Sequence, residues 1–539
     1  MTLIQSFTEL LIARGHSQRV ALITDALQQF DHGSMHRHNI ELKLNAPEAL
    51  SHLLFETGKN DDEVRMICSA LEMVYRGSTS AVKASFFETG KLMIPEWLKV
   101  SNQYEESSRL NRNVRASVVS ITRIFLYFSR VPDLRPILAQ QAGFFNMLIR
   151  VSAKAMHGQG MEKCREDRMK ILANLCNCNL NRIIIFENSE LMDSLYKVAF
   201  QDESVHVREY AAACLMDLSS SEAIQIHMAS SSNIIQALIK LTRKSESDST
   251  REYAVTAIQN ICFQRDNRIQ IINFENSVIL GLLSTIMITD RSKVTRRRAA
   301  GALTNLACST TASRMANYPH LMESTAKVCA LDPCPEVQHR ACRALTKISC
   351  HIDSTMQCFM TVLDSLIRAA TSSNATGIPM VLRIMSRKPS NRAIMGQQPG
   401  MMELLSSIAS STNYSESERE SCIKVIAHIA NEIICRKSLC NKWILNALVS
   451  AAQWEEPEVL NVNPAPELMG ILKSTREAAL LAIERLAMEV SNRPFMARHK
   501  DLLVVIAKAT ERESRLNSVD DSIQPKLAKA LLMSLIVAL

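Results

Sequence analysis

Apolar and polar residues recur with a helical period along most of the chain. The segments REYAAACLMDLS (208–219) and REYAVTAIQNIC (251–262) space alanine, leucine, isoleucine and cysteine three or four residues apart, which places them on one face of a helix. Arginine begins both segments, and a polar residue follows nine positions later, at Asp217 and Asn260, 43 residues apart. The pattern predicts two equivalent amphipathic helices within an internal repeat.

The same frame extends in both directions. Asn174 and Asn305 hold the polar position one repeat earlier and one repeat later, at spacings of 43 and 45 residues. Weaker copies give this position to Met73, Arg123, Lys347, His428, Arg485 and Ser534, and a degenerate copy covers 377–386. Units of about 40–47 residues are two or three helices that bury their apolar faces only by stacking. We therefore predict an all-α fold, a right-handed α-solenoid (superhelix) of about eleven helical repeats.

A helical wheel predicts which face of the repeated helix is buried. Positions six, three and two before the polar residue, and one after it, share a face. We expect these residues to form the core and the polar residue to point away from it. The buried set is then Ala211, Cys214, Leu215 and Leu218, with Ala254, Ala257, Ile258 and Ile261, and with Ala299, Ala302, Leu303 and Leu306.

The composition narrows the fold and function classes. With 14 glycines and 15 prolines in 539 residues, the chain has too few turn residues for a β-sandwich or a β-barrel. The net charge of +8 is mild at this length and does not by itself indicate a nucleic-acid binder. Fifteen cysteines without small-domain spacing favour free thiols in a reducing compartment, so we expect a cytoplasmic or nuclear protein.

The pattern Arg-x-x-Ala-x-x-Ala-Leu-x-Asn-Leu, best preserved at 208–218, 251–261 and 296–306, resembles the armadillo-repeat family. The terminal repeats diverge toward HEAT repeats. The resemblance implies that the third helix of each repeat lines a concave groove, where its asparagine clamps the backbone of an extended peptide. The residues that would hold this position are Asn174, Asn260 and Asn305, with Asp217 as a departure that accepts hydrogen bonds but cannot donate them.

The resemblance is not a close match to the importin-α import adaptors. Those adaptors carry tryptophan four residues before the asparagine, where this chain has Lys170, Ala213, Thr256 and Gly301. Its three tryptophans lie elsewhere, at Trp97, Trp443 and Trp454. A nuclear transport receptor of the importin type is therefore kept only as an alternative.

The predicted groove becomes cationic from residue 297 onward. Like charges one turn apart cost helix stability, so an aligned basic strip suggests a bound acidic or phosphorylated segment. The strip consists of Arg297, Arg298, Arg340, Arg343 and Lys347. A solvated helix start is the alternative interpretation. Nucleic-acid binding through 291–347 is a further alternative, which the acidic residues elsewhere in the chain disfavour.

Two tyrosines at equivalent positions, Tyr210 and Tyr253, have two interpretations. They suit a peptide-binding surface, or they brace one repeat against the next. The recurring asparagine could also end its helix as a cap, but its regular spacing favours a position in the groove. The repeated dipeptides at 181–182, 267–268, 391–392 and 492–493, all Asn-Arg, are explained by turns and by arginine bonds to freed carbonyls.

The chain is predicted to have an N-terminal helical cap at 1–60 and a repeat solenoid at 61–539. The best-defined repeats lie at 160–350, and those at 351–539 are divergent. Polar or proline-containing inserts at 244–250, 371–379 and 453–468 are predicted to be loops, and continuity of the solenoid across 371–400 and 453–468 is left open. Membrane attachment by the first helices is the alternative to a cap.

No catalytic, phosphate-binding or zinc motif is recognised in the sequence. The His32, His36 and His38 cluster is interpreted as a solvated loop, and the glycine pair at 158–160 as a weak signal. No window of 18 apolar residues lacks polar interruptions, so no membrane span is expected. We predict a non-enzymatic scaffold that binds extended segments of other proteins without a cofactor or metal, its oligomeric state left open.

Overall fold

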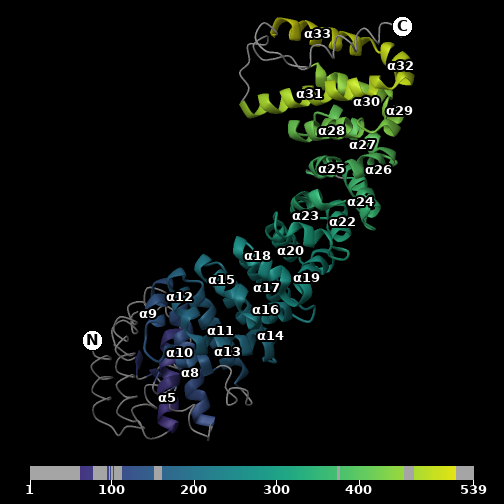
Figure 1. Cartoon of the computed structure of the whole chain (residues 1–539). Helices are drawn as coiled ribbons and strands as arrows, with labels where there is room; N and C mark the ends of the chain where they lie inside the picture. Colours follow the sequence, from purple (N-terminus) through teal and green to yellow (C-terminus); the bar gives the residue numbers. More distant parts are fainter. Residues whose placement is uncertain are drawn as a thin grey trace. The chain divides into compact units, whose positions relative to one another are not determined.

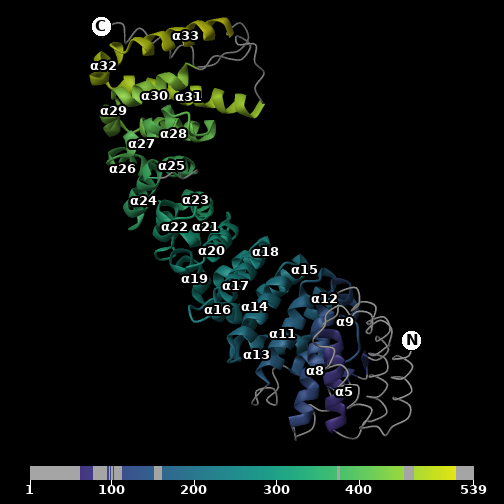
Figure 2. The ribbon, with the colours of Figure 1, turned by 180° about the vertical axis from the view of Figure 1, so that it is seen from behind.

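The computed structural model describes residues 61–76, 94–95, 97–98, 101, 112–150, 161–372, 377–453 and 466–516. All regular secondary structure in these ranges is helical (Figure 1). The chain divides into two compact units, 1–270 and 271–539. Within each unit the helices form a repeated three-helix pattern and stack side by side in rows (Figure 2). The predicted all-α solenoid fold is confirmed.

The third helix of each repeat is usually the longest, and each packs on the third helix of the next repeat within its unit. In the first unit these third helices are α5 (Asp61–Arg76), α8 (Arg112–Ser129), α11 (Glu162–Cys176), α14 (Val205–Ser219) and α17 (Asp248–Ile261). In the second unit they are α20 (Lys293–Leu306), α23 (Pro335–Ile348), α25 (Ile378–Ser386), α28 (Glu416–Ile429) and α31 (Pro466–Met488).

A second row of helices packs against the third helices. In the first unit it contains α10 (Phe144–Ile149), α13 (Ser189–Gln201) and α16 (Ser232–Leu241). In the second unit it contains α19 (Val278–Thr289), α22 (Leu321–Leu331), α24 (Phe359–Ser372), α27 (Met401–Ser410) and α30 (Lys442–Ala452), and α33 (Lys500–Leu516) continues the row by packing on α30.

Short first helices connect one repeat to the next. They are α9 (Arg135–Ala139), α12 (Asn179–Glu187), α15 (Glu222–Ser230), α18 (Arg265–Asn273), α21 (Ala312–Ala316), α26 (Pro389–Gln397), α29 (Ile433–Leu439) and α32 (Arg493–Ala497). The repeat that contains α24 and α25 has only the 3-10 turn η6 (Ser349–His351) before α24. Three further 3-10 turns are η2 (Pro132–Leu134), η5 (Phe274–Ser277) and η8 (Val490–Asn492).

The apolar face predicted for the third helices is the buried face. Ala211, Leu215 and Leu218 of α14 are fully buried, and so are all the residues predicted for the core face of α17 and α20. Alanine and cysteine at two of these positions let the neighbouring helices approach closely, while leucine and isoleucine fill the space between them. The repeat frame read from the sequence therefore identifies the core correctly.

The polar face is narrower than the wheel predicts. Thr256 of α17 is 8% exposed, and Gly301 of α20 is also buried. These two positions, four residues before the polar position, are covered because a neighbouring third helix of the same unit packs closely against each of these helices. The polar positions Asn174, Asn260 and Asn305 are half-buried, so they lie at the edge of the contact between helices.

All three predicted loops are shorter than expected, because a helix begins within each of them. Helix α31 already begins at Pro466, within the insert at 453–468, because proline is compatible with the first turn of a helix. Helix α25 begins at Ile378 after Gly377, whose φ of 96° suits the left-handed conformation that glycine adopts readily. The insert at 244–250 is a turn up to Ser247, and α17 then starts at Asp248.

One stretch, Arg265–Thr289, has the length and apolar composition of a membrane span. It is not a continuous α-helix, because η5 interrupts it with positive φ values at Glu275, Asn276 and Ser277. Half of its most apolar window is buried within the protein. The stretch therefore has the character of core helices rather than of a lipid-facing span.

Several sequence predictions concern residues outside the described ranges. These are the cap at 1–60 with its histidine cluster, the glycine pair at 158–160, most of the insert at 453–468, and the last repeat around Ser534. The short gap at 373–376 lies within the segment where continuity was left open.

Candidate peptide-binding surface

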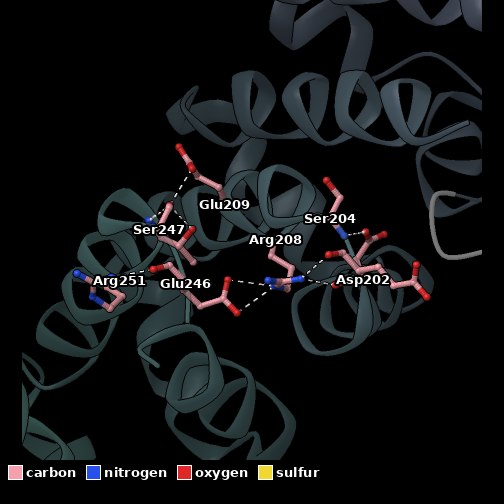
Figure 3. Close-up of polar contacts among 9 residues, drawn as sticks. Asp202, Ser204, Arg208, Glu209, Glu246, Ser247 and Arg251 are labelled. Carbon is pink, nitrogen blue, oxygen red and sulfur yellow. Dashed lines mark hydrogen bonds and ion pairs between the residues drawn. The ribbon is translucent and has the colours of Figure 1, made fainter. Parts of the chain in front are cut away.

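An arginine near the start of the third helix is joined to an acidic residue before the third helix of the next repeat. Arg165 Nε lies 3.0 Å from Asp202 Oδ2, and Arg208 Nε lies 3.0 Å from Glu246 Oε1. Figure 3 shows Arg208 pointing toward Glu246, with Asp202 on its other side. Arg208 Nη1 also donates to the carbonyl of Asp202, at 2.6 Å. These arginines therefore tie neighbouring repeats together and do not face a ligand.

The second unit contains the same contact. Arg296 Nε lies 2.7 Å from Asp332 Oδ2, and its Nη2 lies 3.1 Å from Oδ1. This bidentate pair is almost fully buried, so the loss of one partner would leave a buried charge without its counterion. The arginine that marks each repeat in the sequence is thus a structural residue.

The Asn-Arg dipeptides form an amide clamp between repeats. Asn391 donates from Nδ2 to the carbonyls of Met385, at 2.9 Å, and of Ile352, at 3.1 Å. Arg392 Nε donates to the carbonyl of Ser386 at 3.0 Å. The same bond to a carbonyl six residues earlier is made by Asn181, Asn267 and Asn492, and by Arg182, Arg268, Arg436 and Arg493. The structural interpretation of these dipeptides is confirmed.

The asparagine at the polar position reaches back to the preceding third helix. Asn174 Nδ2 donates to Ser129 Oγ at 3.0 Å, and Asn260 Nδ2 donates to Ser219 Oγ at 3.0 Å. Each amide has a second N–H and a carbonyl oxygen, which make no other hydrogen bond within the described residues. In each of these two asparagines, one N–H therefore stabilises the contact between repeats, and the other N–H and the side-chain oxygen can bind a ligand at the surface. Asn305 is likewise half-buried, on α20.

The surface of the first unit around the two tyrosines is acidic and aromatic. Lys170 Nζ lies 5.0 Å from the centroid of the Tyr210 ring. Burial raises the pKa of Tyr253, and the negative charges of Glu209, Glu252 and Asp217 raise it further. Burial also raises the pKa of Asp217. Tyr210 thus contacts the preceding third helix, while both tyrosines stay half-buried beside carboxylates.

The second unit carries a cluster of guanidinium groups on two adjacent third helices, which we call the arginine cluster: Arg297, Arg298, Arg340 and Arg343. Burial lowers the pKa of Arg340, and the positive charges of Arg297, Arg298 and Arg343 lower it further. The structure thus brings together four of the five basic residues that the sequence singled out on α20 and α23. Glu336 forms an ion pair with Arg297 at the edge of the cluster.

Lys347 is the fifth predicted basic residue, and it has a structural contact. Its Nζ donates to the carbonyl of Thr304 at 2.8 Å, which links α23 to α20. The side chain is nevertheless exposed. The sequence did not single out Glu336 or Lys170 as part of these surfaces, because neither stands at the polar position of the repeat.

The described residues contain no group of three or more His, Cys, Asp or Glu side chains placed to hold a metal ion. All fifteen cysteines are free thiols. Burial raises the pKa of Cys68 and of Cys262 to about 12, so these thiols stay protonated at neutral pH and are poor nucleophiles. What the described surfaces offer is charge, aromatic rings and amides for recognition.

Comparisons with known proteins agree with this geometry. Residues 223–263, which run from the start of α15 through α16 to just beyond α17, match the armadillo/beta-catenin-like repeat. No curated protein matches the chain. Among solved structures, SYS-1 has a TM-score of 0.63 at 10% identity and covers 92% of this chain and 98% of its own.

Two further solved structures share the fold. One comes from work on a phosphorylation switch that controls the interaction between cadherin and beta-catenin, with a TM-score of 0.56 at 13% identity and 99% of each chain covered. An engineered protein has a TM-score of 0.52 at 14% identity, covering 90% of this chain and 98% of its own. The chain therefore contains an armadillo repeat, and its helices have the armadillo-type fold that its sequence resembles.

Proposed function

We propose that this chain is a non-enzymatic scaffold that holds extended segments of partner proteins along its third helices. The polar positions would bind the peptide backbone through the remaining N–H and carbonyl of Asn174 and Asn260, with Asn305 at the equivalent position of α20. Side chains beside them would select the sequence. A reducing compartment, cytoplasm or nucleus, suits its fifteen free thiols.

The observation that carries the proposal is the arginine cluster on α20 and α23. Burial disfavours the charge of Arg340, the positive charges of Arg297, Arg298 and Arg343 disfavour it further, and Glu336 offsets only part of this effect. Perturbed ionisable groups cluster at functional sites, and an anionic ligand would compensate for the repulsion at Arg340. Guanidinium groups bind carboxylate and phosphate through paired, charge-assisted hydrogen bonds. The partner segment would therefore be acidic or phosphorylated.

The comparisons are consistent with a protein partner. The SYS-1 fold also appears in a complex with POP-1, at a TM-score of 0.56, and the beta-catenin structure concerns an interaction with cadherin that a phosphorylation switch controls. The surface of the first unit has the opposite character, since Glu209, Asp217 and the two tyrosines would favour a cationic or hydrogen-bond-donating side chain.

A charge-reversal experiment tests this proposal. The variant Arg298→Glu/Arg340→Glu/Arg343→Glu is compared with Lys327→Glu/Lys437→Glu/Arg498→Glu, which changes the net charge equally at exposed residues outside the third helices. Fluorescence anisotropy measures the Kd of a labelled phosphoserine peptide for the full chain. Each charge-assisted bond contributes about 1.5–3 kcal/mol, so we expect at least about a hundredfold loss in the first variant alone.

Two outcomes would contradict the proposal. Equal losses in both variants would indicate attraction to net charge and not to a site. Binding of single-stranded RNA that is tighter than peptide binding, with a steep salt dependence and the same sensitivity to the first variant, would favour the nucleic-acid alternative.

A further inference from the structure

His428 on α28 stands at the polar position of its third helix and is held by the helix before it. Its Nδ1 lies 2.8 Å from Ser386 Oγ, at the end of α25. The Ser386 hydroxyl donates to the carbonyl of Arg383 at 2.9 Å, so its oxygen accepts a hydrogen bond from the N–H at His428 Nδ1. The ring therefore gains or loses its second proton at Nε2, which makes no hydrogen bond within the described residues.

Guanidinium groups from three other elements surround this ring. Arg485 of α31 donates from Nη1 to the carbonyl of Ala427, at 2.8 Å, and Arg392 of α26 is bonded to the carbonyl of Ser386. Arg387, which directly follows α25, is exposed, and its positive charge also acts on His428. The carbonyls fix where Arg392 and Arg485 lie, but a neutral carbonyl does not cancel their charge.

The carboxylates nearby do not balance these charges. Glu420 lies 3.4 Å from Arg383 Nη1 but is shared with Lys424, at 2.6 Å. Glu432 lies 3.6 Å from Arg392 Nη1. Burial lowers the pKa of Arg485, the charge of Glu484 works against this, and the charges of Arg392 and Arg436 lower the pKa further. Within the described residues Arg387 has no acidic partner, so the surroundings of His428 carry an excess of positive charge.

Burial of the ring and this excess of positive charge together set its protonation state. Burial, and then the charges of Arg392, Arg387, Arg383 and Arg485, lower the pKa of His428 to about 4. The ring is therefore neutral at pH 7. An anion placed beside it would neutralise the guanidinium groups and let Nε2 take up a proton and donate to the anion.

We propose that Arg387, Arg392, His428 and Arg485 form a second anion-binding site, the His428 site, in which Ser386 holds the ring of His428 and the other four residues take a phosphate or carboxylate group of a partner segment. This inference rests on the proposed function, because the same extended segment would also occupy the arginine cluster. Helices α23, α25 and α28 pack in succession. Neighbouring helices lie about 8–10 Å apart, so about five or six extended residues would separate the two anionic groups.

Peptide binding to the full chain tests the His428 site. Three peptides share a phosphoserine at a first position and differ at a second position, six residues later. The second position is alanine in one peptide, glutamate in another and phosphoserine in the third. A fourth places its second phosphoserine two residues on. We expect the six-residue diphosphopeptide to bind about tenfold tighter than the alanine peptide. Arg387→Gln and His428→Gln should abolish that gain, while the matched exposed control Arg498→Gln keeps it. A similar gain for glutamate would identify carboxylate as the ligand.

Histidine NMR with labelled Cε1 gives an independent readout, with the His428 signal assigned by its absence from His428→Gln. The diphosphopeptide should raise the pKa of His428 above its value of about 4 in the free protein. Because binding then takes up a proton, the affinity difference between wild type and His428→Gln should grow as the pH falls from 7 toward 5. Comparing these proteins at each pH cancels the titration of the peptide's own phosphates.

The outcomes separate this inference from the proposed function. Equal affinity for the diphosphopeptide and the alanine peptide, with both still sensitive to reversal of the arginine cluster, would overturn the His428 site alone. A gain that is the same at two-residue spacing, or that survives both Arg387→Gln and His428→Gln, would also overturn it. Stronger competition by single-stranded RNA than by the diphosphopeptide would assign the site to another class of ligand. Insensitivity of every peptide to reversal of the arginine cluster would overturn the proposed function.

Discussion

Replacing Asn391 with leucine tests how much the amide clamp contributes to the fold. The Asn391 side chain is fully buried and makes three hydrogen bonds to backbone: it donates to Met385 O and Ile352 O and accepts from Ser354 N at 2.7 Å. Leucine is of similar size but leaves these groups without partners. Each buried group left unsatisfied costs about 1–3 kcal/mol, so we expect a loss of at least about 3 kcal/mol.

Hydrogen exchange resolved along the chain is the appropriate assay, because stacked repeats open locally and a single unfolding transition need not exist. Amides of α25 and α26 should exchange about a hundredfold faster in Asn391→Leu, since 1.4 kcal/mol corresponds to a factor of ten. Asn413→Leu is the control, because Asn413 is exposed and its side chain makes no hydrogen bond within the described residues. Acceleration no larger than that of the control would refute the clamp.

Three further predictions concern packing, pH and thiol chemistry. Gly396→Ala places a methyl group 2.5 Å from the thiol sulfur of Cys435 on α29, so it should lower the free energy of unfolding by about 1–3 kcal/mol. Gly470→Ala is the control, because its methyl group meets no atom within 4 Å. It should raise the free energy of unfolding by about 0.5–1 kcal/mol, and urea titrations measure both changes. In the folded state the pKa of His428 is lowered from 6.5 to about 4, so the wild-type protein loses stability as the pH falls through this range. The free energy of unfolding of His428→Gln should therefore depend less on pH than that of the wild type. A urea midpoint that falls equally in both proteins between pH 7 and pH 5 would contradict this. Iodoacetamide at pH 8 should modify the exposed Cys350 and leave the buried Cys262 intact, as peptide mass spectrometry would show.

The repeat period and the buried face were predictable from the sequence because both depend on local spacing. Ala211, Leu215 and Leu218 stand where a helix of 3.6 residues per turn places them on one side, and stacking repeats need that side buried. The structural meaning of the Asn-Arg dipeptides was also predictable, because asparagine and arginine are the residues that satisfy free carbonyls at helix ends.

The candidate sites were only partly predictable. The arginine cluster was predictable because its four residues all lie on repeated third helices, whose positions the repeat frame gives. The His428 site was missed because Arg387, Arg392 and Arg485 come from different helices, and two of them lie outside the repeated polar position. The bond from Asn260 to Ser219 was missed for a similar reason, since Ser219 belongs to the preceding repeat. Only the stacking of helices reveals such partners.

The proposed function places an acidic or phosphorylated segment on α20 and α23. Photo-crosslinking tests this placement without reference to affinity, with a phosphoserine peptide that carries a diazirine beside its phosphate and with mass spectrometry of the crosslinked full chain. We expect crosslinks within Lys293–Leu306 and Pro335–Ile348, which are lost in Arg298→Glu/Arg340→Glu/Arg343→Glu. Crosslinks concentrated on second-row helices such as α19 and α22, and retained in that variant, would show that the segment binds elsewhere.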